Sequence, residues 1–231
     1  MKKAVISTLC DVLVLGFLVL LWMLDIPSWK KLDLNKLTDL NQTTVVYDYL
    51  NQPVNSLHAG ENRVYISIEE IPEHVRNAFI AIEDIRFYEH PGVDIRRIGG
   101  ALLNNLKTLS FSEGASTITQ QLIKLTHLTS EKKLSRKAQE AWLALQLERV
   151  AEKDEILEMY LNVVYFGRSA YGIEAASQSY FGKPCKELTL AEGALLAGII
   201  KAPSAYAPHI HPENALSHRA PHRALHSYRN G

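Results

Sequence analysis

The hydrophobic positions divide the chain into an apolar N-terminal run, a polar stretch and a long helical region. Residues 4–24 are apolar apart from a single charge at Asp11. A helix needs about 20 apolar residues, at about 1.5 Å each, to cross a bilayer. One carboxylate costs roughly 2.5–3.5 kcal/mol at the bilayer centre, which a run of this length tolerates. Because no small-x-small cleavage site follows, we predict an uncleaved signal anchor after a basic tip of residues 1–3, and the lysines on both sides of the run leave its orientation open.

A polar neck is expected over residues 25–71. Residues 43–49 are rich in β-branched and aromatic side chains, and residues 63–68 alternate apolar and polar positions through Val64, Ile66 and Ile68. Both patterns are typical of short strands.

Beyond Pro72 the apolar residues recur at three- and four-residue steps, which is the period of an amphipathic helix. The first such set predicts a helix that ends near residues 83–85 and comprises Val75, Ala78, Phe79, Ile82 and Ile85. Further helices are predicted over residues 117–126, 131–150, 154–161, 170–180 and 189–200, the last with Thr189 and Glu192 spaced as a capping box. Residues 102–111 are apolar without helical regularity, and we expect a segment that is either mobile or in contact with the membrane. The fold class is therefore mainly α.

Charge and cysteine content exclude several classes of function. Lys and Arg number 25, as do Asp and Glu, and the pI is near 7.1, so the basic footprint of a nucleic-acid binder is missing. Two cysteines, Cys10 and Cys185, make neither a disulfide scaffold nor a zinc site. His218, His222 and His226 recur at four-residue spacing, but a proline interrupts any helix there and no acidic ligands accompany them. We therefore expect no nucleic-acid partner for the chain. We also expect no metal site among these three histidines.

The first candidate for chemistry is the acidic pair Glu83 and Asp84, which ends an apolar helix. A carboxylate at such an edge is partly desolvated and suits a general base. An isolated acidic pair at a helix end is more often solvated surface, so the residues alone leave both interpretations open.

The second candidate is the segment that begins at Gly114. A glycine turn leads hydroxyl and amide side chains into a helix start, with Lys124 one turn beyond Gln120. Free backbone N–H groups at a helix N-terminus, with a lysine nearby, suit a phosphate. Thr117 and Gln120 are also spaced as an ordinary capping box, and on spacing alone this is the better interpretation.

The third candidate is a charged helix face that carries Lys133, Arg136, Lys137 and Glu140. The two middle residues precede Glu140 by four and three positions, so both can pair with it. Such a set can bind a diphosphate while the glutamate orients or protonates a departing oxygen. By itself the pattern is more often a solvated, salt-bridged face.

In their order and wording, these signals match five motifs of one family. The first three motifs are Glu83-Asp84-x-x-Phe87-x-x-His90-x-Gly92, Gly114-x-Ser116-Thr117-Ile118-Thr119-Gln120-Gln121 and Arg136-Lys137-x-x-Glu140. The fourth runs from Ile156-Leu157-Glu158-x-Tyr160-Leu161-Asn162 to Tyr180-Phe181-Gly182-Lys183, and the fifth from Leu190-x-Glu192 to Tyr206-x-Pro208. Over about residues 63–215 the chain resembles the peptidoglycan glycosyltransferases, glycosyltransferase family 51.

The resemblance implies a lysozyme-like, mainly helical domain that polymerises lipid II. It implies that Glu83 is the base that deprotonates the 4-hydroxyl of the acceptor sugar. Glu140, with Lys124, Arg136 and Lys137, would hold or help to expel the diphosphate. The remaining positions carried over from the motifs as substrate-binding are Asp84, Phe87, His90, Ser116, Thr117, Gln120, Gln121, Lys132 and Asn162.

The resemblance also implies location and partners. The domain would lie at the outer face of the cytoplasmic membrane with the N-terminus inside. The expected partners are lipid II, the growing glycan chain, the membrane and other cell-wall synthesis proteins, and moenomycin is the expected inhibitor. No tightly bound cofactor is implied, and a divalent cation (Mg or Mn) at the diphosphate is an open alternative.

The chain departs from the family at two places. Glu131-Lys132 stands where many members have Glu-Arg, which keeps the charge but loses the bidentate fork. The glycosyltransferase region, residues 72–216, is followed by an irregular tail, residues 217–231, in place of a paired arginine and an apolar helix. We therefore expect a truncated or frameshifted class A penicillin-binding protein without its transpeptidase domain, with a monofunctional polymerase as the alternative.

Two other functions stay open at this stage. A non-catalytic membrane scaffold that binds lipid II or cell-wall partners would be consistent with the unusual tail. A lysozyme-like muramidase would share the fold and the glutamate, but it would not explain the basic third motif.

Overall fold

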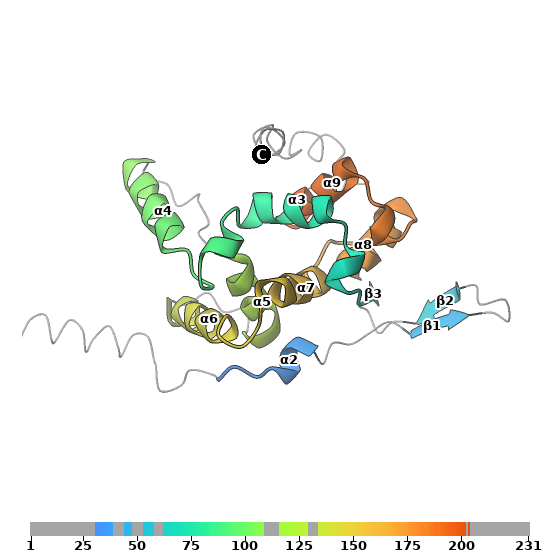
Figure 1. Ribbon diagram of the computed structural model, residues 1–231, viewed down its shortest axis with the longest axis horizontal. Helices are drawn as coiled ribbons and strands as arrows, with labels where there is room; N and C mark the ends of the chain where they lie inside the picture. The colour runs from blue at the N-terminus through green and yellow to red at the C-terminus, as the bar shows by residue number, and fades with distance from the viewer. Residues whose placement is uncertain are drawn as a thin grey trace, which may run out of the picture.

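The computed structural model describes residues 31–38, 44–47, 53–57, 62–108, 116–128, 134–201 and 203. The described part is mainly α-helical (Figure 1). Its helices are α2 (Asn35–Thr38), α3 (Glu73–Glu83), α4 (Ile95–Thr108), α5 (Ile118–His127), α6 (Leu134–Leu147), α7 (Lys153–Val163), α8 (Ile173–Phe181) and α9 (Leu190–Ile199). Short 3-10 turns are η2 (Ile68–Glu70), η3 (Phe87–Glu89) and η4 (Cys185–Glu187), and the strands are β1 (Thr44–Tyr47), β2 (Pro53–Leu57), β3 (Asn62–Arg63) and β4 (Ala170–Tyr171).

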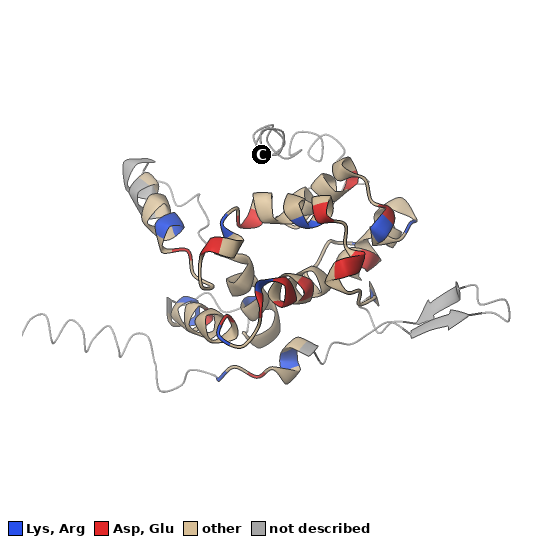
Figure 2. Cartoon of the chain, in the orientation of Figure 1, with Lys and Arg blue, Asp and Glu red and all other residues tan. Residues whose placement is uncertain are grey.

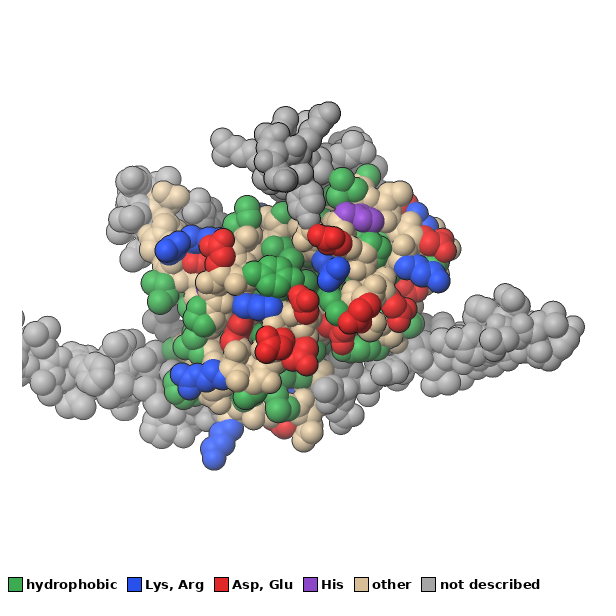
Figure 3. All heavy atoms as spheres, viewed as in Figure 1, with side chains coloured by type: hydrophobic (Ala, Val, Ile, Leu, Met, Phe, Trp, Pro, Cys, Tyr) green, Lys and Arg blue, Asp and Glu red, His purple; other side chains and the backbone are tan. Residues whose placement is uncertain are grey.

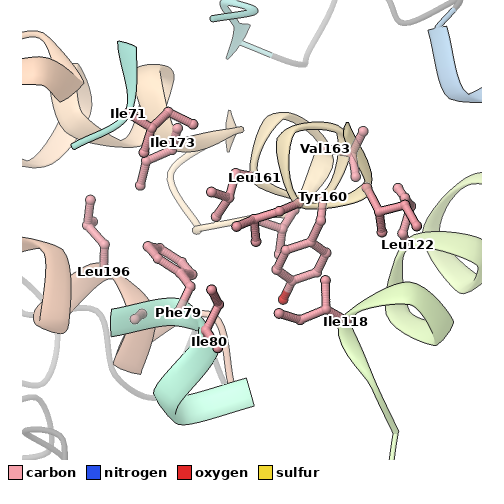
Figure 4. Packing of buried hydrophobic residues seen from close by; sticks show 14 of the residues in the cluster. Ile71, Phe79, Ile80, Ile118, Leu122, Tyr160, Leu161, Val163, Ile173 and Leu196 are labelled. Carbon is pink, nitrogen blue, oxygen red and sulfur yellow. The ribbon is translucent and has the colours of Figure 1, made fainter. Parts of the chain in front are cut away.

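The helices pack in two groups around one core. In the first group α3 lies along α9, and in the second α5 packs against both α6 and α7 (Figure 1). Side chains from all of these elements meet in the core, and Figure 4 shows Phe79, Ile118, Leu122, Tyr160 and Leu196 among them. Each of the five is fully buried. Burying one large apolar side chain contributes about 1.5–3 kcal/mol, so the core dominates the stability of this arrangement.

Two predicted helix starts are confirmed with their caps. Thr117 caps α5 by accepting a hydrogen bond from the Gln120 N–H at 3.1 Å, and the Gln120 side chain accepts from the Thr117 N–H at 3.1 Å. Thr189 and Glu192 form the same reciprocal pair at the start of α9. These bonds satisfy N–H groups that have no partner inside the helix, and so they fix where each helix begins.

The structure differs from the sequence prediction over residues 102–108, and residues 109–111 of that predicted segment lie outside the described residues. Instead of an irregular apolar segment, Ile95–Thr108 form helix α4, which stands at one end of the molecule (Figure 1). Adjacent Gly99 and Gly100 weaken the helical signal in this segment, because glycine is a poor helix former. Residues 102–108 of the segment interpreted as irregular are therefore the second half of one helix, whose first half contains the glycine pair.

The strand predictions are only partly confirmed. β1 lies within the predicted run and pairs antiparallel with β2, a strand that the sequence did not indicate because it begins with a proline. The predicted strand over residues 63–68 is wrong beyond Arg63, because β3 is only two residues long and pairs parallel with β4. Beyond it, the Asn162 amide takes the place of a neighbouring strand by bonding Ile66 N–H at 3.0 Å and Ile66 C=O at 2.9 Å.

The predicted helix over residues 170–180 begins later than expected. Ala170–Tyr171 form β4, and α8 starts only after Gly172. Gly172 has a φ of 85°, which lies in the left-handed region, so the chain turns there from strand to helix.

The segment before the helical body packs into the core. Leu37 of α2 is 1% exposed and belongs to the main hydrophobic cluster. Nearby, His127 Nε2 at the end of α5 lies 3.0 Å from the Asp33 C=O and 3.2 Å from its N–H. Residues 31–37 are therefore docked on the end of α5.

The expected signal anchor, residues 4–24, and the expected tail, residues 217–231, lie outside the described residues. Within the described ranges, no helix combines the length and the apolar character that crossing a membrane requires.

Candidate active site

Glu83 is the last residue of α3, and its side chain is half-buried. Its Oε2 accepts a hydrogen bond of 2.6 Å from Gln121 Nε2 of α5. Its backbone C=O accepts a bond of 2.5 Å from Arg97 Nη1 of α4. The helix ends here because Asp84 leaves the helical conformation, with φ at −157°. Arg97 of α4 therefore holds the backbone at the end of α3, and Gln121 of α5 holds the carboxylate.

Asp84 points the opposite way, into the protein, and is 1% exposed. Both of its oxygens lie 3.0 Å from His90 Nε2, and Oδ2 also accepts from the Ile118 N–H at 3.1 Å. His90 Nδ1 accepts from the Gly92 N–H at 3.2 Å, so the proton of a neutral ring sits on Nε2 and points to Asp84. Asp84 and His90 thus bind the loop after α3 to the start of α5.

Phe87 lies beneath this loop and is fully buried. Lys153 Nζ lies 4.5 Å from the centre of its ring and donates to the His90 C=O at 2.6 Å. The same ammonium group donates to Glu148 Oε1 at 2.8 Å. The predicted substrate-binding positions Asp84, Phe87 and His90 are therefore interior side chains that shape the loop.

The third motif forms a second polar cluster. Lys137 Nζ donates to Ser116 Oγ at 2.7 Å and also to Glu140 Oε1. Glu140 is 1% exposed, whereas the Lys137 side chain is 45% exposed. A buried carboxylate is costly without a paired charge, and Lys137 supplies that charge from the solvent side. The alternative of a wholly solvated face is therefore wrong for Glu140.

Only one of the two pairings predicted on this helix face is formed in the described part of the chain. Glu140 pairs with Lys137, three residues earlier, and no ion pair joins it to Arg136. Arg136 Nε is buried and has no hydrogen-bond partner among the described residues. The Arg136 guanidinium therefore has a buried Nε–H donor that no described residue satisfies.

The start of α5 contacts both clusters. Ser116, just before the helix, receives the Lys137 hydrogen bond, and Gln121 in the first turns holds Glu83. Thr117 and Gln120 are buried and form the cap, and Lys124 is exposed farther along the helix. The N–H groups of Ile118 and Gln120 already donate to side chains, so the cap interpretation is confirmed, and those two groups are not free for a phosphate.

Asp84, His90 and Asp94 each offer one possible metal-ligand atom, and these atoms all lie within 4.8 Å of one another. Such a spacing could hold a metal ion. Asp94 accepts from Arg86 through both oxygens, at 2.7–3.0 Å. Burial alone would raise the pKa of Asp94, but bonds from the Arg97 N–H and the Arg86 guanidinium outweigh it and hold the pKa below its usual value. Because these groups already satisfy one another, the grouping is explained without a metal.

Two predicted positions lie elsewhere. Asn162 is fully buried, and its amide bonds the backbone of Ile66 and the C=O of Glu158, so it holds the neck against α7. Lys132 and its neighbour Glu131 lie outside the described residues.

The sequence interpretation gave no role to two residues that contact the site. Arg97 bonds the backbone of Glu83, and Tyr160 lies behind Gln121, with its hydroxyl 3.4 Å from Gln121 Oε1. Tyr160 belongs to the fourth motif, and this membership was the signal in the sequence that could have indicated a role for it. Nothing in its spacing indicates that it meets a residue of the second motif.

Comparisons with known proteins identify the family of this chain. A family model described as Transglycosylase matches residues 50–225. Penicillin-binding protein 1F of Bacillus subtilis is 49% identical over 78% of this chain and 25% of its own length. Penicillin-binding protein 1A of Aquifex aeolicus is 46% identical over 95% of this chain and 30% of its own length. A crystal structure of penicillin-binding protein 1A from Haemophilus influenzae aligns with 78% of this chain and 17% of its own, at 22% identity and a TM-score of 0.39.

The chain thus spans less than a third of the length of these relatives. The family match covers most of the chain, including every described residue of both polar clusters and the helices that carry them. The protein belongs to the transglycosylase family, related to the penicillin-binding proteins 1A.

Proposed function

We propose that the chain is an inverting peptidoglycan glycosyltransferase, which polymerises lipid II into glycan strands and releases undecaprenyl diphosphate. One observation carries the proposal: the start of α5 contacts both a carboxylate suited to proton abstraction and a cationic cluster suited to a diphosphate. Family membership supports the same reaction class.

In this proposal Glu83 is the general base. Its carboxylate takes the proton of the acceptor 4-hydroxyl, and the oxygen attacks the anomeric carbon of the growing chain. The hydrogen bond from Gln121 occupies one carboxylate oxygen, Oε2, and fixes the direction of the other. A base that is already oriented contributes typically 10²–10⁴-fold to the rate of such a step.

As the new bond forms, the bond between the anomeric carbon and the diphosphate oxygen breaks. The diphosphate leaves with the electron pair, so negative charge develops on its oxygens. Lys137 is exposed toward the solvent and is held by Ser116 and Glu140, and the neighbouring Arg136 adds a second positive charge, with an Nε–H that no described residue satisfies. Fixed positive groups aimed at developing charge lower the barrier most effectively.

The residues of this cluster do not fit a resident divalent cation well. Magnesium is usually held by one or two carboxylates together with substrate phosphates. Glu140 is the carboxylate of the cluster, and the Lys137 ammonium already bonds its Oε1. We therefore assign charge neutralisation here to Lys137 and Arg136 and derive no step through a metal.

We place the domain at the outer face of the cytoplasmic membrane, held by the anchor expected over residues 4–24. Ile95 and Ile98 of α4 are 79% and 42% exposed and lie three residues apart, so they share one helix face. Figures 2 and 3 show acidic side chains gathered over η2 and α7, where Glu69, Glu70, Asp154 and Glu155 are exposed. An acidic face is repelled by anionic lipid, which favours an orientation with α4 toward the bilayer.

The decisive experiment is polymerisation of labelled lipid II by the detergent-solubilised full chain. The wild type should form glycan polymer, and moenomycin should stop it. Glu83→Gln should lower the rate by at least about 10²-fold, because it removes only the base. Glu187→Gln is the matched control, since Glu187 is an exposed glutamate of η4 and should leave the rate unchanged.

Other outcomes separate the alternatives. A folded chain that binds lipid II but forms no polymer would be a scaffold. Release of soluble muropeptides from purified sacculi would instead indicate a muramidase. An unchanged rate in Glu83→Gln would remove Glu83 from its assigned role.

A further inference from the structure

A buried phenol lies directly behind the amide that holds Glu83. Tyr160 of α7 is fully buried, and Figure 4 shows its ring extending toward α3 and α5, with the hydroxyl beside Ile118. The hydroxyl lies 3.4 Å from Gln121 Oε1, and Gln121 Nε2 donates to Glu83 Oε2 at 2.6 Å. A chain of two hydrogen bonds therefore runs from the core to the Glu83 carboxylate.

The two neighbours of Gln121 require opposite ends of its amide. The Glu83 carboxylate accepts hydrogen bonds and so requires the NH₂ end, whereas the Tyr160 hydroxyl donates and requires the carbonyl end. A reversed amide would place its oxygen against the carboxylate and its NH₂ group against the phenol hydroxyl. The orientation of Gln121 is thus specified from both sides.

The phenol remains a donor over the working pH range. Burial raises the pKa of Tyr160 well above its ordinary value, and the negative charge of Glu83 raises it further. A buried hydroxyl that lost its acceptor would also lose stability, because a buried polar group without a partner costs about 1–3 kcal/mol. Both effects keep the O–H directed at Gln121.

The other groups around Glu83 do not orient its carboxylate. Arg97 of α4 bonds the backbone C=O of Glu83 rather than its carboxylate. Asp84, the next residue of the chain, is turned inward and paired with His90. Gln121 is the group that bonds the carboxylate in the described structure, and Tyr160 is the group behind Gln121.

We propose that Tyr160 is a positioning residue for the glycosyl transfer: its hydroxyl orients the Gln121 amide, which in turn holds Glu83 as an aligned, charged base. The inference rests on the function proposed above. The 3.4 Å distance fits this role, since hydrogen bonds around a reacting group are often long without substrate and shorten in the complex.

The test removes a single oxygen. Tyr160→Phe keeps the buried ring and deletes the hydroxyl. We expect kcat to fall about tenfold with KM nearly unchanged, and the acidic limb of the kcat/KM profile to move to higher pH, because the carboxylate form of Glu83 loses support. Tyr180→Phe is the matched control, since its hydroxyl donates to the Phe166 C=O at 2.8 Å and has no bond to Gln121.

A double-mutant cycle distinguishes positioning from general destabilisation. If Tyr160 acts through Gln121, Tyr160→Phe should have no further effect on kcat in a Gln121→Ala background. Equal losses of kcat in both backgrounds, or a pH profile that overlays that of the wild type, would overturn the proposal.

A readout without turnover keeps the two proposals separate. The Glu83 carboxyl can be followed by carbon NMR in the full chain labelled at glutamate, with Glu83→Gln to assign its signal. Titration at higher pH in Tyr160→Phe than in the wild type supports the hydrogen-bond chain even if lipid II is not polymerised. An unshifted titration refutes the chain even if lipid II is polymerised.

Discussion

The backbone N–H of Ile118 donates a hydrogen bond to the carboxylate of Asp84 at 3.1 Å, although the two residues are 34 positions apart. This bond joins the loop after α3 to the first residue of α5. Since Glu83 precedes Asp84 and Gln121 follows Ile118 by three residues, the same two segments are also joined by the bond from Gln121 to Glu83.

Replacing Asp84 by alanine should therefore destabilise the fold. It leaves the buried Ile118 N–H and the His90 ring without their acceptor, and each unsatisfied group costs about 1–3 kcal/mol. We expect the free energy of unfolding to fall by about 3 kcal/mol, measured by denaturant unfolding of the solubilised chain. The exposed Glu187→Ala variant is the control, and a similar loss in both would argue against the buried network.

Gly172→Ala tests the turn between β4 and α8. At a φ of 85° an added Cβ would lie 2.7 Å from the Asn162 C=O, which is backbone and has no free rotamer to yield. We expect the free energy of unfolding to fall by about 3 kcal/mol, or the variant to fail to fold. Thermal unfolding of the variant and the wild type measures this.

Gly99→Ala is the counterpart in α4, where nothing lies within 4 Å of the added Cβ. Alanine favours a helix over glycine by about 1 kcal/mol, so this variant should be as stable as the wild type or slightly more stable. Destabilisation by Gly99→Ala to the same extent as by Gly172→Ala would contradict the assignment of a helix there.

Leu37→Ala tests whether the neck belongs to the core. Leu37 is 1% exposed, and truncating a buried leucine costs about 2–5 kcal/mol through lost burial and a residual cavity. Leu34→Ala, three residues earlier and 52% exposed, should cost less than about 0.5 kcal/mol. Equal melting temperatures for the two variants would show that residues 31–37 do not stabilise the body.

Glu192 should make the stability contributed by the start of α9 depend on pH. Its pKa is lowered from 4.5 to about 2, first by the hydrogen bond from Lys183 and then by those from Thr189. A lowered pKa means that this stabilisation is complete above about pH 4.5 and disappears as the pH falls toward 2.

Glu192→Gln keeps the acceptor but removes the charge. The wild type should be more stable than this variant by about 1 kcal/mol at pH 7, and the difference should vanish by about pH 2. The free energy of unfolding of both proteins, measured between pH 2 and pH 7, tests this expectation. A difference that stays constant with pH would exclude the charge as its source.

Local signals in the sequence predicted the helices well, because helix caps and apolar periodicity depend on near neighbours. α3, α5, α7 and α9 begin and end within a few residues of the predicted bounds. The glycine pair in α4 and the initial proline in β2 weakened those signals, so both elements were missed. The strand prediction beyond Arg63 failed because the partner of Ile66 is a side chain 96 positions away.

The candidate site was predictable in its residue types but not in its contacts. The motifs indicated Glu83, Gln121, Lys137 and Glu140, and the structure brings them together in two pairs. The inward orientation of Asp84 and the place of Tyr160 behind Gln121 arise from packing between distant helices. Spacing along one chain carries no information about such contacts.

The contact between Asp33 and His127 fixes the N-terminal segment at the end of α5 that lies away from Glu83. The ten residues of α5 span about 15 Å, with the Glu83–Gln121 pair near one end and the segment that leads back toward residue 31 fixed at the other. The length of one short helix therefore separates the residue proposed as the base from the point at which the N-terminal segment joins the body.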